Sequence, residues 1–167
     1  YFKNFLVSDN TINLNGDSEI TLAEAQATTE LIMDGIGIAD LTGIEAFTNL
    51  TRLDVPNNSL TTIDVSNNLS LTRLHAGFNN LTSLDIRLNT NIDELFCHEN
   101  SALETLLISN GNNSNFIYMK AYSNASLTCI QVDAGFSPPA NSGQYVVGWT
   151  KDGQTSYSKI VYQQFIM

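Results

Sequence analysis

The chain has 167 residues, 43% of them hydrophobic and only 14% charged, and its formal net charge is −10. This acidic balance argues against a nucleic-acid binder, because phosphate contacts need clustered Lys and Arg, and against docking on anionic lipid. No apolar run approaches the 18 residues that a membrane-spanning helix needs, so we expect no membrane span. Few Lys residues, abundant Asn, Ser and Thr, and a first residue other than Met favour a trimmed protein that is secreted or displayed at the cell surface.

A candidate calcium loop lies near the N-terminus, where residues 13–24 read NLNGDSEITLAE. The spacing fits the EF-hand pattern, in which oxygen ligands alternate along a tight loop and a carboxylate opens the next helix. The predicted ligands are Asn13, Asn15, Asp17, Glu19 and Glu24. Asn13 lowers the ligand charge, and Ser18 stands where the pattern has a turn-forming glycine. Two interpretations stay open: bound calcium, or a loop that keeps its shape without metal.

Residues 20–33 predict a short helix with Thr21 as its N-cap and Glu24 at the spacing of a capping box. Together with the loop, this helix is expected to form an N-terminal cap over residues 1–33. Residues 31–50 then predict a lead-in coil with six inward apolar side chains. These are Leu31, Met33, Ile38, Leu41, Ile44 and Phe47.

Residues 34–133 are dominated by a repeated unit that reads apolar-x-x-apolar-x-apolar-x-x-Asn. Alternate early units are 21 residues apart, as in Leu50, Leu71 and Ile92. Alternation inside each unit has the strand period of two, and the final Asn suits a turn. One such coil cannot bury its apolar face alone, so successive coils must stack.

These units resemble leucine-rich repeats of the short 21-residue nested type from secreted proteins of Bacteroidetes-like bacteria. The lines LTTIDVSNNLSLTRLHAGFNNLTSLDI (60–86) and DLTGIEAFTNLTRLDVPNNSL (40–60) carry the resemblance. It implies a leucine-rich-repeat solenoid that is rich in β-structure, with a short N-terminal helix cap and strands on both long sides of a flattened coil. It also implies a non-catalytic module that recognises another protein and needs no cofactor other than possible calcium.

The stretch 134–167 loses the repeat and is expected to form a C-terminal cap. Residues 144–150 and 156–162 alternate enough to predict a terminal hairpin, with its turn at 151–153. Trp149, Tyr157 and Tyr162 would then cover the last coil.

The outward positions of alternate units form a candidate binding row, which mixes both charges with aromatic rings. The row comprises Arg52, Asp54, Arg73, His75, Glu94, Phe96, Tyr118 and Lys120. Aromatic residues beside Arg are typical of interface hot spots. Three interpretations stay open: a protein partner, a polysaccharide stacked on the rings in an accessory domain of a larger secreted protein, and a solvated face of a structural spacer.

Catalysis has little support in the sequence. His75 could pair with Asp54 one coil earlier, but no nucleophile is expected beside them, because Cys97 takes an inward apolar position. A flat solenoid face also offers no cleft. Cys97 and Cys129 are expected on different rows and should not form a disulfide. His98 is expected to be solvated in a turn.

Overall fold

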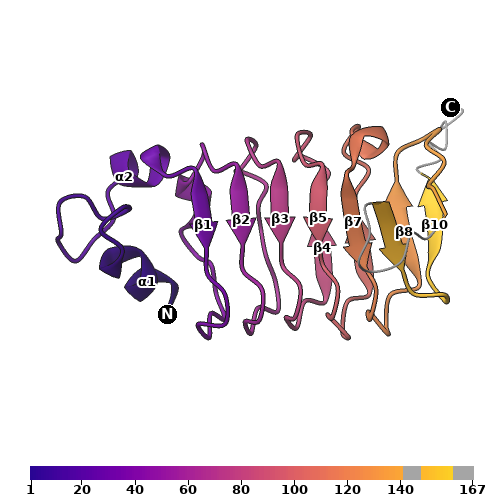
Figure 1. The fold of residues 1–167 in the computed structure, drawn as a ribbon, viewed down its shortest axis with the longest axis horizontal. Helices are drawn as coiled ribbons and strands as arrows, with labels where there is room; N and C mark the ends of the chain where they lie inside the picture. The colour runs from indigo at the N-terminus through magenta and orange to yellow at the C-terminus, as the bar shows by residue number, and fades with distance from the viewer. Residues whose placement is uncertain (141–147, 160–167) are drawn as a thin grey trace, which may run out of the picture.

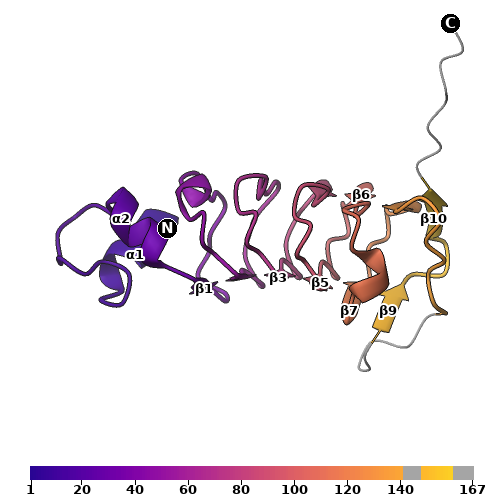
Figure 2. The same cartoon turned by 90° about the horizontal axis from the view of Figure 1, so that it is seen from above.

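The computed structural model describes residues 1–140 and 148–159 and shows an elongated solenoid of stacked coils (Figure 1). Two helices lie at the N-terminal end, and strands occupy the two long sides of the coil (Figure 2). Every strand pair is parallel. This confirms the prediction of a solenoid with strands on both long sides.

The first sheet has six strands in the order β1-β2-β3-β5-β7-β9. Its members are β1 (Glu30–Ile32), β2 (Arg52–Asp54), β3 (Arg73–His75), β5 (Glu94–Phe96), β7 (Tyr118–Ala121) and β9 (Gly148–Lys151). The second sheet has four strands in the order β10-β8-β6-β4. Its members are β4 (Ser83–Asp85), β6 (Thr105–Leu107), β8 (Cys129–Val132) and β10 (Ser156–Lys159).

The core lies between the two sheets and runs the length of the solenoid. In the first sheet Leu53 pairs with Leu74, which pairs with Leu95, and all three are 0% exposed. The register therefore places the same repeat position of each coil beside that of the next. This stacking lets neighbouring coils bury one another's apolar faces, which a single coil could not do.

Buried asparagines close the turns between strands, and all of them except Asn110 occupy the Asn position of the repeat. They are Asn58, Asn68, Asn79, Asn89, Asn100, Asn110 and Asn124. The Asn79 side chain accepts a hydrogen bond from Leu60 N at 3.0 Å and donates one to Val55 O at 2.9 Å. Each such amide thus satisfies backbone groups that the turn leaves without a sheet partner.

The N-terminal cap contains two helices, α1 (Phe2–Ser8) and α2 (Leu22–Ala27). The predicted capping box of α2 is present, because Thr21 and Glu24 exchange hydrogen bonds. The helix is shorter than the predicted 20–33, since residues 30–32 pair with β2 as β1. The sequence analysis missed α1, which buries Phe2 and Leu6 at the end of the core.

Two short 3-10 helices, η1 (Ile44–Ala46) and η2 (Asn113–Asn115), lie in the connections between coils. The six apolar residues predicted to face inward in the lead-in coil are all buried. No helix among the described residues is long and apolar enough to cross a membrane.

The predicted terminal hairpin is wrong. β9 pairs in parallel with β7, and β10 pairs in parallel with β8, so this segment adds another coil to both sheets. Trp149 takes the inward position beside Met119 and is 2% exposed, which makes it a core residue. It packs against Phe116, Phe136 and Tyr157. Tyr162 and residues 144–147 of the predicted hairpin lie outside the described residues.

Candidate interaction surface

The outer face of the first sheet carries all eight residues of the predicted binding row. Register aligns them in two columns along the solenoid. One column holds Glu30, Arg52, Arg73, Glu94 and Tyr118, and the other holds Ile32, Asp54, His75, Phe96 and Lys120. Adjacent strands in a sheet lie about 5 Å apart, so neighbouring members of each column can touch.

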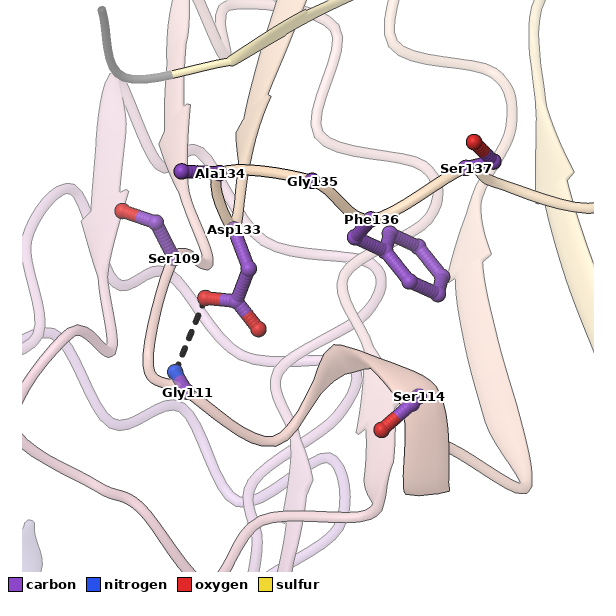
Figure 3. A pocket seen from close by; sticks show the side chains of 8 residues that line it. All are labelled: Ser109, Gly111, Ser114, Asp133, Ala134, Gly135, Phe136 and Ser137. Carbon is purple, nitrogen blue, oxygen red and sulfur yellow. Dashed lines mark hydrogen bonds between the residues drawn. The ribbon is translucent and has the colours of Figure 1, made fainter.

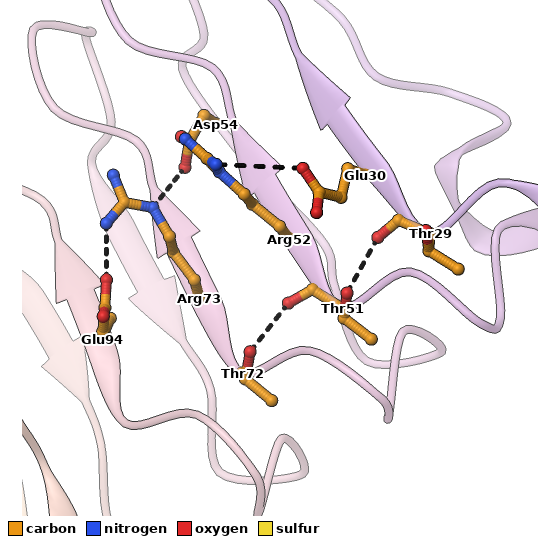
Figure 4. A network of polar contacts seen from close by, with 8 residues as sticks. All are labelled: Thr29, Glu30, Thr51, Arg52, Asp54, Thr72, Arg73 and Glu94. Carbon is orange, nitrogen blue, oxygen red and sulfur yellow. Dashed lines mark hydrogen bonds and ion pairs between the residues drawn. The ribbon is translucent and has the colours of Figure 1, made fainter. Parts of the chain in front are cut away.

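An ion ladder occupies the N-terminal half of this face (Figure 4). The Asp54 carboxylate binds Arg52 at 2.6 Å and Arg73 at 2.9 Å, and Arg73 also pairs with Glu94. Arg52 lies 3.8 Å from Glu30, which extends the ladder to β1. The ladder thus links four consecutive strands through charged side chains of alternating sign.

The sequence analysis expected Asp54 to be exposed, but the residue is buried. The residue is only 4% exposed, because the two guanidinium groups of adjacent coils cover its carboxylate. Removing one partner of a buried ion pair leaves an uncompensated charge, so this carboxylate acts as a structural centre for Arg52 and Arg73. Lys120, also expected to be exposed, is likewise only 4% exposed.

An aromatic cluster lies on β3, β5 and β7 of the same face, where it overlaps the ladder on β3 and β5, and it continues into the turns that follow these strands. Its members are His75, Phe78, Phe96, His98, Tyr118 and Tyr122. Neighbouring ring centroids lie 4.7–5.6 Å apart, within the usual range for aromatic pairs. Arg73 lies 4.7 Å from the centroid of Phe96, and Lys120 lies 5.6 Å from that of Tyr118.

His98 is buried rather than solvated, because Gly77 on the preceding coil leaves room for its ring. A Cβ atom at Gly77 would lie 3.0 Å from His98 Cε1 and 3.2 Å from His75 Nε2. Burial, and secondarily repulsion from His75, lowers the pKa of His98 to about 4. Burial also lowers the pKa of His75. Both imidazoles are therefore neutral at neutral pH.

The predicted pair of His75 with Asp54 does not form. The Asp54 carboxylate is held by two arginines, and His75 Nε2 has no hydrogen-bond partner in the described part of the chain. Cys97 is 0% exposed, and burial raises the pKa of its thiol to about 12, so it is no nucleophile. Cys97 and Cys129 are both free thiols, which confirms that they do not bridge.

A pocket of about 470 Å³ lies on the second sheet, where Asp64 and Asp85 both contribute to its lining. Hydrogen bonds from Ser66 lower the pKa of Asp64, and those from Arg87 lower the pKa of Asp85. Both carboxylates are therefore ionised at neutral pH. Hydrolysis of a glycoside by two carboxylates needs one protonated acid, which this pair does not supply.

A larger pocket, of about 630 Å³, lies near the C-terminal end between residues 109–114 and 133–137 (Figure 3). The Asp133 carboxylate at its centre accepts hydrogen bonds from Gly111 N at 2.8 Å and Asn113 N at 3.0 Å. These bonds hold the insertion that contains η2 against β8. The carboxylate therefore has a structural role in this pocket.

The predicted calcium ligands near the N-terminus are engaged in hydrogen bonds of their own loop. Glu24 Oε1 accepts from Leu14 N at 2.8 Å, and Oε2 accepts from Thr21 N at 2.8 Å. The side-chain oxygens of the other predicted ligands are engaged as well. Asn13 accepts from Gly16 N, Asn15 accepts from Asp17 N, Asp17 accepts from Glu19 N, and Glu19 binds Lys3.

The loop also differs from the EF-hand pattern in its backbone. In the EF-hand pattern the sharp turn falls at the position of Ser18. Here the residue with left-handed backbone conformation is Gly16, with φ 69°, so the turn comes two residues earlier. In this arrangement the predicted ligands do not form a ready calcium site, and binding would require them to exchange hydrogen bonds for metal contacts. Calcium binding by residues 13–24 stays a prediction.

Comparisons with known proteins identify the fold. No protein-family model matches the chain, and no curated protein matches it. Among solved structures, an internalin (InlF) from Listeria monocytogenes str. 4b F2365 aligns with a TM-score of 0.53 and 25% identity, covering 79% of this chain and 45% of that one. The fold is a leucine-rich-repeat solenoid, similar to that of this internalin.

The functional domain of InlJ from Listeria monocytogenes, which includes a cysteine ladder, aligns with a TM-score of 0.47 and 30% identity. That alignment covers 68% of this chain and 27% of the InlJ chain. The chain therefore spans less than half the length of these two internalins. Solenoids of this fold are typically non-catalytic.

The sequence analysis missed Phe78, His98 and Tyr122 as members of the surface. It considered only two outward positions per strand, whereas His98 and Tyr122 occupy a third outward position after the strand end, and Phe78 lies in the turn one residue beyond that position. The 21-residue register could have found this position, since Gly77 and His98 occupy it on successive coils.

Proposed function

We propose that the chain is a secreted or cell-surface recognition module that binds another protein through the outer face of its first sheet. The observation that carries the proposal is the aromatic cluster beside the ion ladder on one rigid face. Tyr, Trp and Arg are the residues most enriched in interface hot spots. The likeness to an internalin at 25% identity supports the same role.

The side chains of this face are already held in place before a partner binds, which supports the proposal. Arg73 is held by two carboxylates and lies over Phe96, and Phe96 lies 5.6 Å from Tyr118. These side chains therefore have little rotamer freedom left to lose when a partner docks. Binding to pre-ordered groups avoids the entropy cost that immobilised side chains otherwise impose.

Polysaccharide binding is the second candidate, because Phe96 and Tyr118 present neighbouring half-buried rings on a flat sheet. A cation already lies over each of these rings, Arg73 over Phe96 and Lys120 over Tyr118. A sugar ring stacking on those same faces would have to displace the cations. This arrangement favours a protein partner.

The test screens the immobilised chain against an array of extracellular proteins and against a panel of polysaccharides. Any ligand found is then measured with Phe96→Ala and Tyr118→Ala, and with Gln131→Ala on the second sheet as the matched control. Loss of a hot spot of about 2 kcal/mol weakens binding about 30-fold. We expect that loss for the first two variants with a protein ligand, and no change for Gln131→Ala.

Loss of polysaccharide retention in the same two variants would favour the second candidate. If every ligand found binds the Phe96 and Tyr118 variants as tightly as the unmodified chain, the proposal is wrong. Circular dichroism of each variant separates lost binding from lost folding.

A further inference from the structure

The turns that follow the strands of the first sheet contain a row of residues with left-handed backbone conformation. This corner row is Gly35, Asn57, Phe78, Glu99 and Ser123, with φ between 55° and 65°. Glycine and asparagine suit this conformation, whereas a bulky side chain is strained in it. Local backbone preference therefore gives no reason for a phenylalanine at position 78.

The Phe78 side chain is not buried to compensate for this strain. The residue is 46% exposed, and its ring packs edge-on against His98 with centroids 5.1 Å apart. Asn57 makes the same turn one coil earlier, so the fold itself does not require an aromatic residue there. Strained residues that persist without a packing reason often serve a binding site.

An exposed glutamate lies in the turn next to that of Phe78. Glu99 occupies the corner row on the next coil, and Phe78 N donates a hydrogen bond to His98 O at 3.0 Å, which fixes the two turns side by side. No hydrogen bond or ion pair holds the Glu99 carboxylate within residues 1–140 and 148–159. The ring and the carboxylate are thus both available to a partner.

Equivalent turns of other coils carry acidic side chains. Asp34 and Asp152 lie at equivalent turns, where Asp34 accepts a hydrogen bond from Asn57 and Asp152 accepts from the backbone of residues 123 and 124. The described turn segments 34–36, 56–58, 77–79, 98–100, 122–124 and 152–153 contain no Lys or Arg. His98 beneath the ring is uncharged at neutral pH, since burial lowers its pKa to about 4.

We propose that Phe78 and Glu99 form a subsite for a cationic side chain, an arginine or lysine, of a basic partner protein. Aromatic faces attract cations, and a carboxylate beside the ring adds a charge-assisted hydrogen bond. The net charge of −10 favours encounter with basic partners. The inference rests on the proposed function and names the chemistry of the partner.

The same face already contains an internal version of this arrangement. Arg73 lies 4.7 Å from the centroid of Phe96 while its guanidinium pairs with Glu94. In that group the ring, the carboxylate and the cation all come from this chain. At Phe78 and Glu99 the ring and the carboxylate come from this chain, and the cation comes from the partner.

The test uses a random library of 12-residue peptides selected on the intact chain and counter-selected on a Phe78→Asn, Glu99→Gln double variant. We expect the selected peptides to be enriched in Arg or Lys. The affinity of the best peptide should fall about tenfold or more with Phe78→Asn, and several-fold with Glu99→Gln. Glu104→Gln, which removes an exposed carboxylate beside the second sheet, is the matched control and should have no effect.

Melting temperature supplies an independent readout, because Asn suits the left-handed turn better than Phe. Phe78→Asn should therefore raise the melting temperature while it weakens peptide binding. A lower melting temperature would show that the ring is structural and overturn the inference. Selected peptides without Arg or Lys, a failure to select any peptide, or equal binding of a citrulline-substituted peptide would each overturn it as well.

The outcome is separable from the broader proposal. A partner that needs Phe96 and Tyr118 but binds Phe78→Asn normally would overturn this subsite and leave the protein-binding face intact. A partner that needs Phe78 and Glu99 but tolerates Tyr118→Ala and Phe96→Ala would support the subsite and overturn the face proposal.

Discussion

The buried asparagines of the turns should contribute a large share of the stability, and Asn79 offers the sharpest test. Its side-chain oxygen accepts a hydrogen bond from Leu60 N, and its NH2 group donates to the carbonyls of Val55, Ala76 and Gly77. The residue is 6% exposed. In Asn79→Ala, the Leu60 N–H loses this partner inside the protein.

The expected magnitude follows from what remains bonded. Each of the three carbonyls keeps a second hydrogen bond, from Asn58, Asn100 or Asn57 N, so only the Leu60 N–H is left without its partner. An unsatisfied buried group costs about 1–3 kcal/mol, and the three lost donor bonds add about 1 kcal/mol together. We expect Asn79→Ala to lower the free energy of unfolding by about 2–4 kcal/mol.

Urea denaturation followed by circular dichroism measures this loss, which should appear as a lower midpoint with an unchanged m-value. The melting temperature should fall by about 4–15 °C. Asn80→Ala is the matched control, since the neighbouring residue is exposed and should change stability by less than about 0.5 kcal/mol. If the two variants lost the same stability, or Asn79→Ala lost less than about 1 kcal/mol, the asparagines would not hold the turns as argued.

Two further predictions concern ionisable groups. If residues 13–24 bind calcium, excess chelator should lower the melting temperature of the unmodified chain, because a ligand that binds only the folded state stabilises that state. The melting temperature of Glu24→Gln should not change. An unchanged melting temperature of the unmodified chain would exclude bound calcium. Because the pKa of His98 lies near 4 in the fold, against an ordinary value of 6.5, the unfolded chain binds the proton first. Stability should therefore decline as the pH is lowered from 6.5 toward 4, and this decline should be shallower in His98→Phe; equal slopes in urea titrations of the two proteins would refute the assignment.

Periodicity alone determined the core of this protein. Leu53, Leu74 and Leu95 recur at the 21-residue spacing that puts them beside one another, and each is fully buried as the pattern requires. The capping box of Thr21 and Glu24 was equally readable, because its hydrogen bonds join residues three apart in the chain. Local and periodic signals suffice where a residue's partners lie at a fixed sequence distance.

Tertiary structure decided the outer surface. Asp54 occupies an outward position and is nevertheless buried, because Arg52 and Arg73 converge on it from adjacent coils. His98 is buried because Gly77, one coil earlier, lacks the side chain that would keep its ring in solvent.

The C-terminal strands show the same division. Short-range alternation around residues 148–159 identified strands but not their partners. The free edges of β7 and β8 provide those partners. An alternating pattern specifies which side of a strand faces inward. The burial and charge state of an outward side chain depend on side chains from neighbouring coils, and the pairing of a strand depends on the strand edge beside it. Only the folded chain brings these groups together.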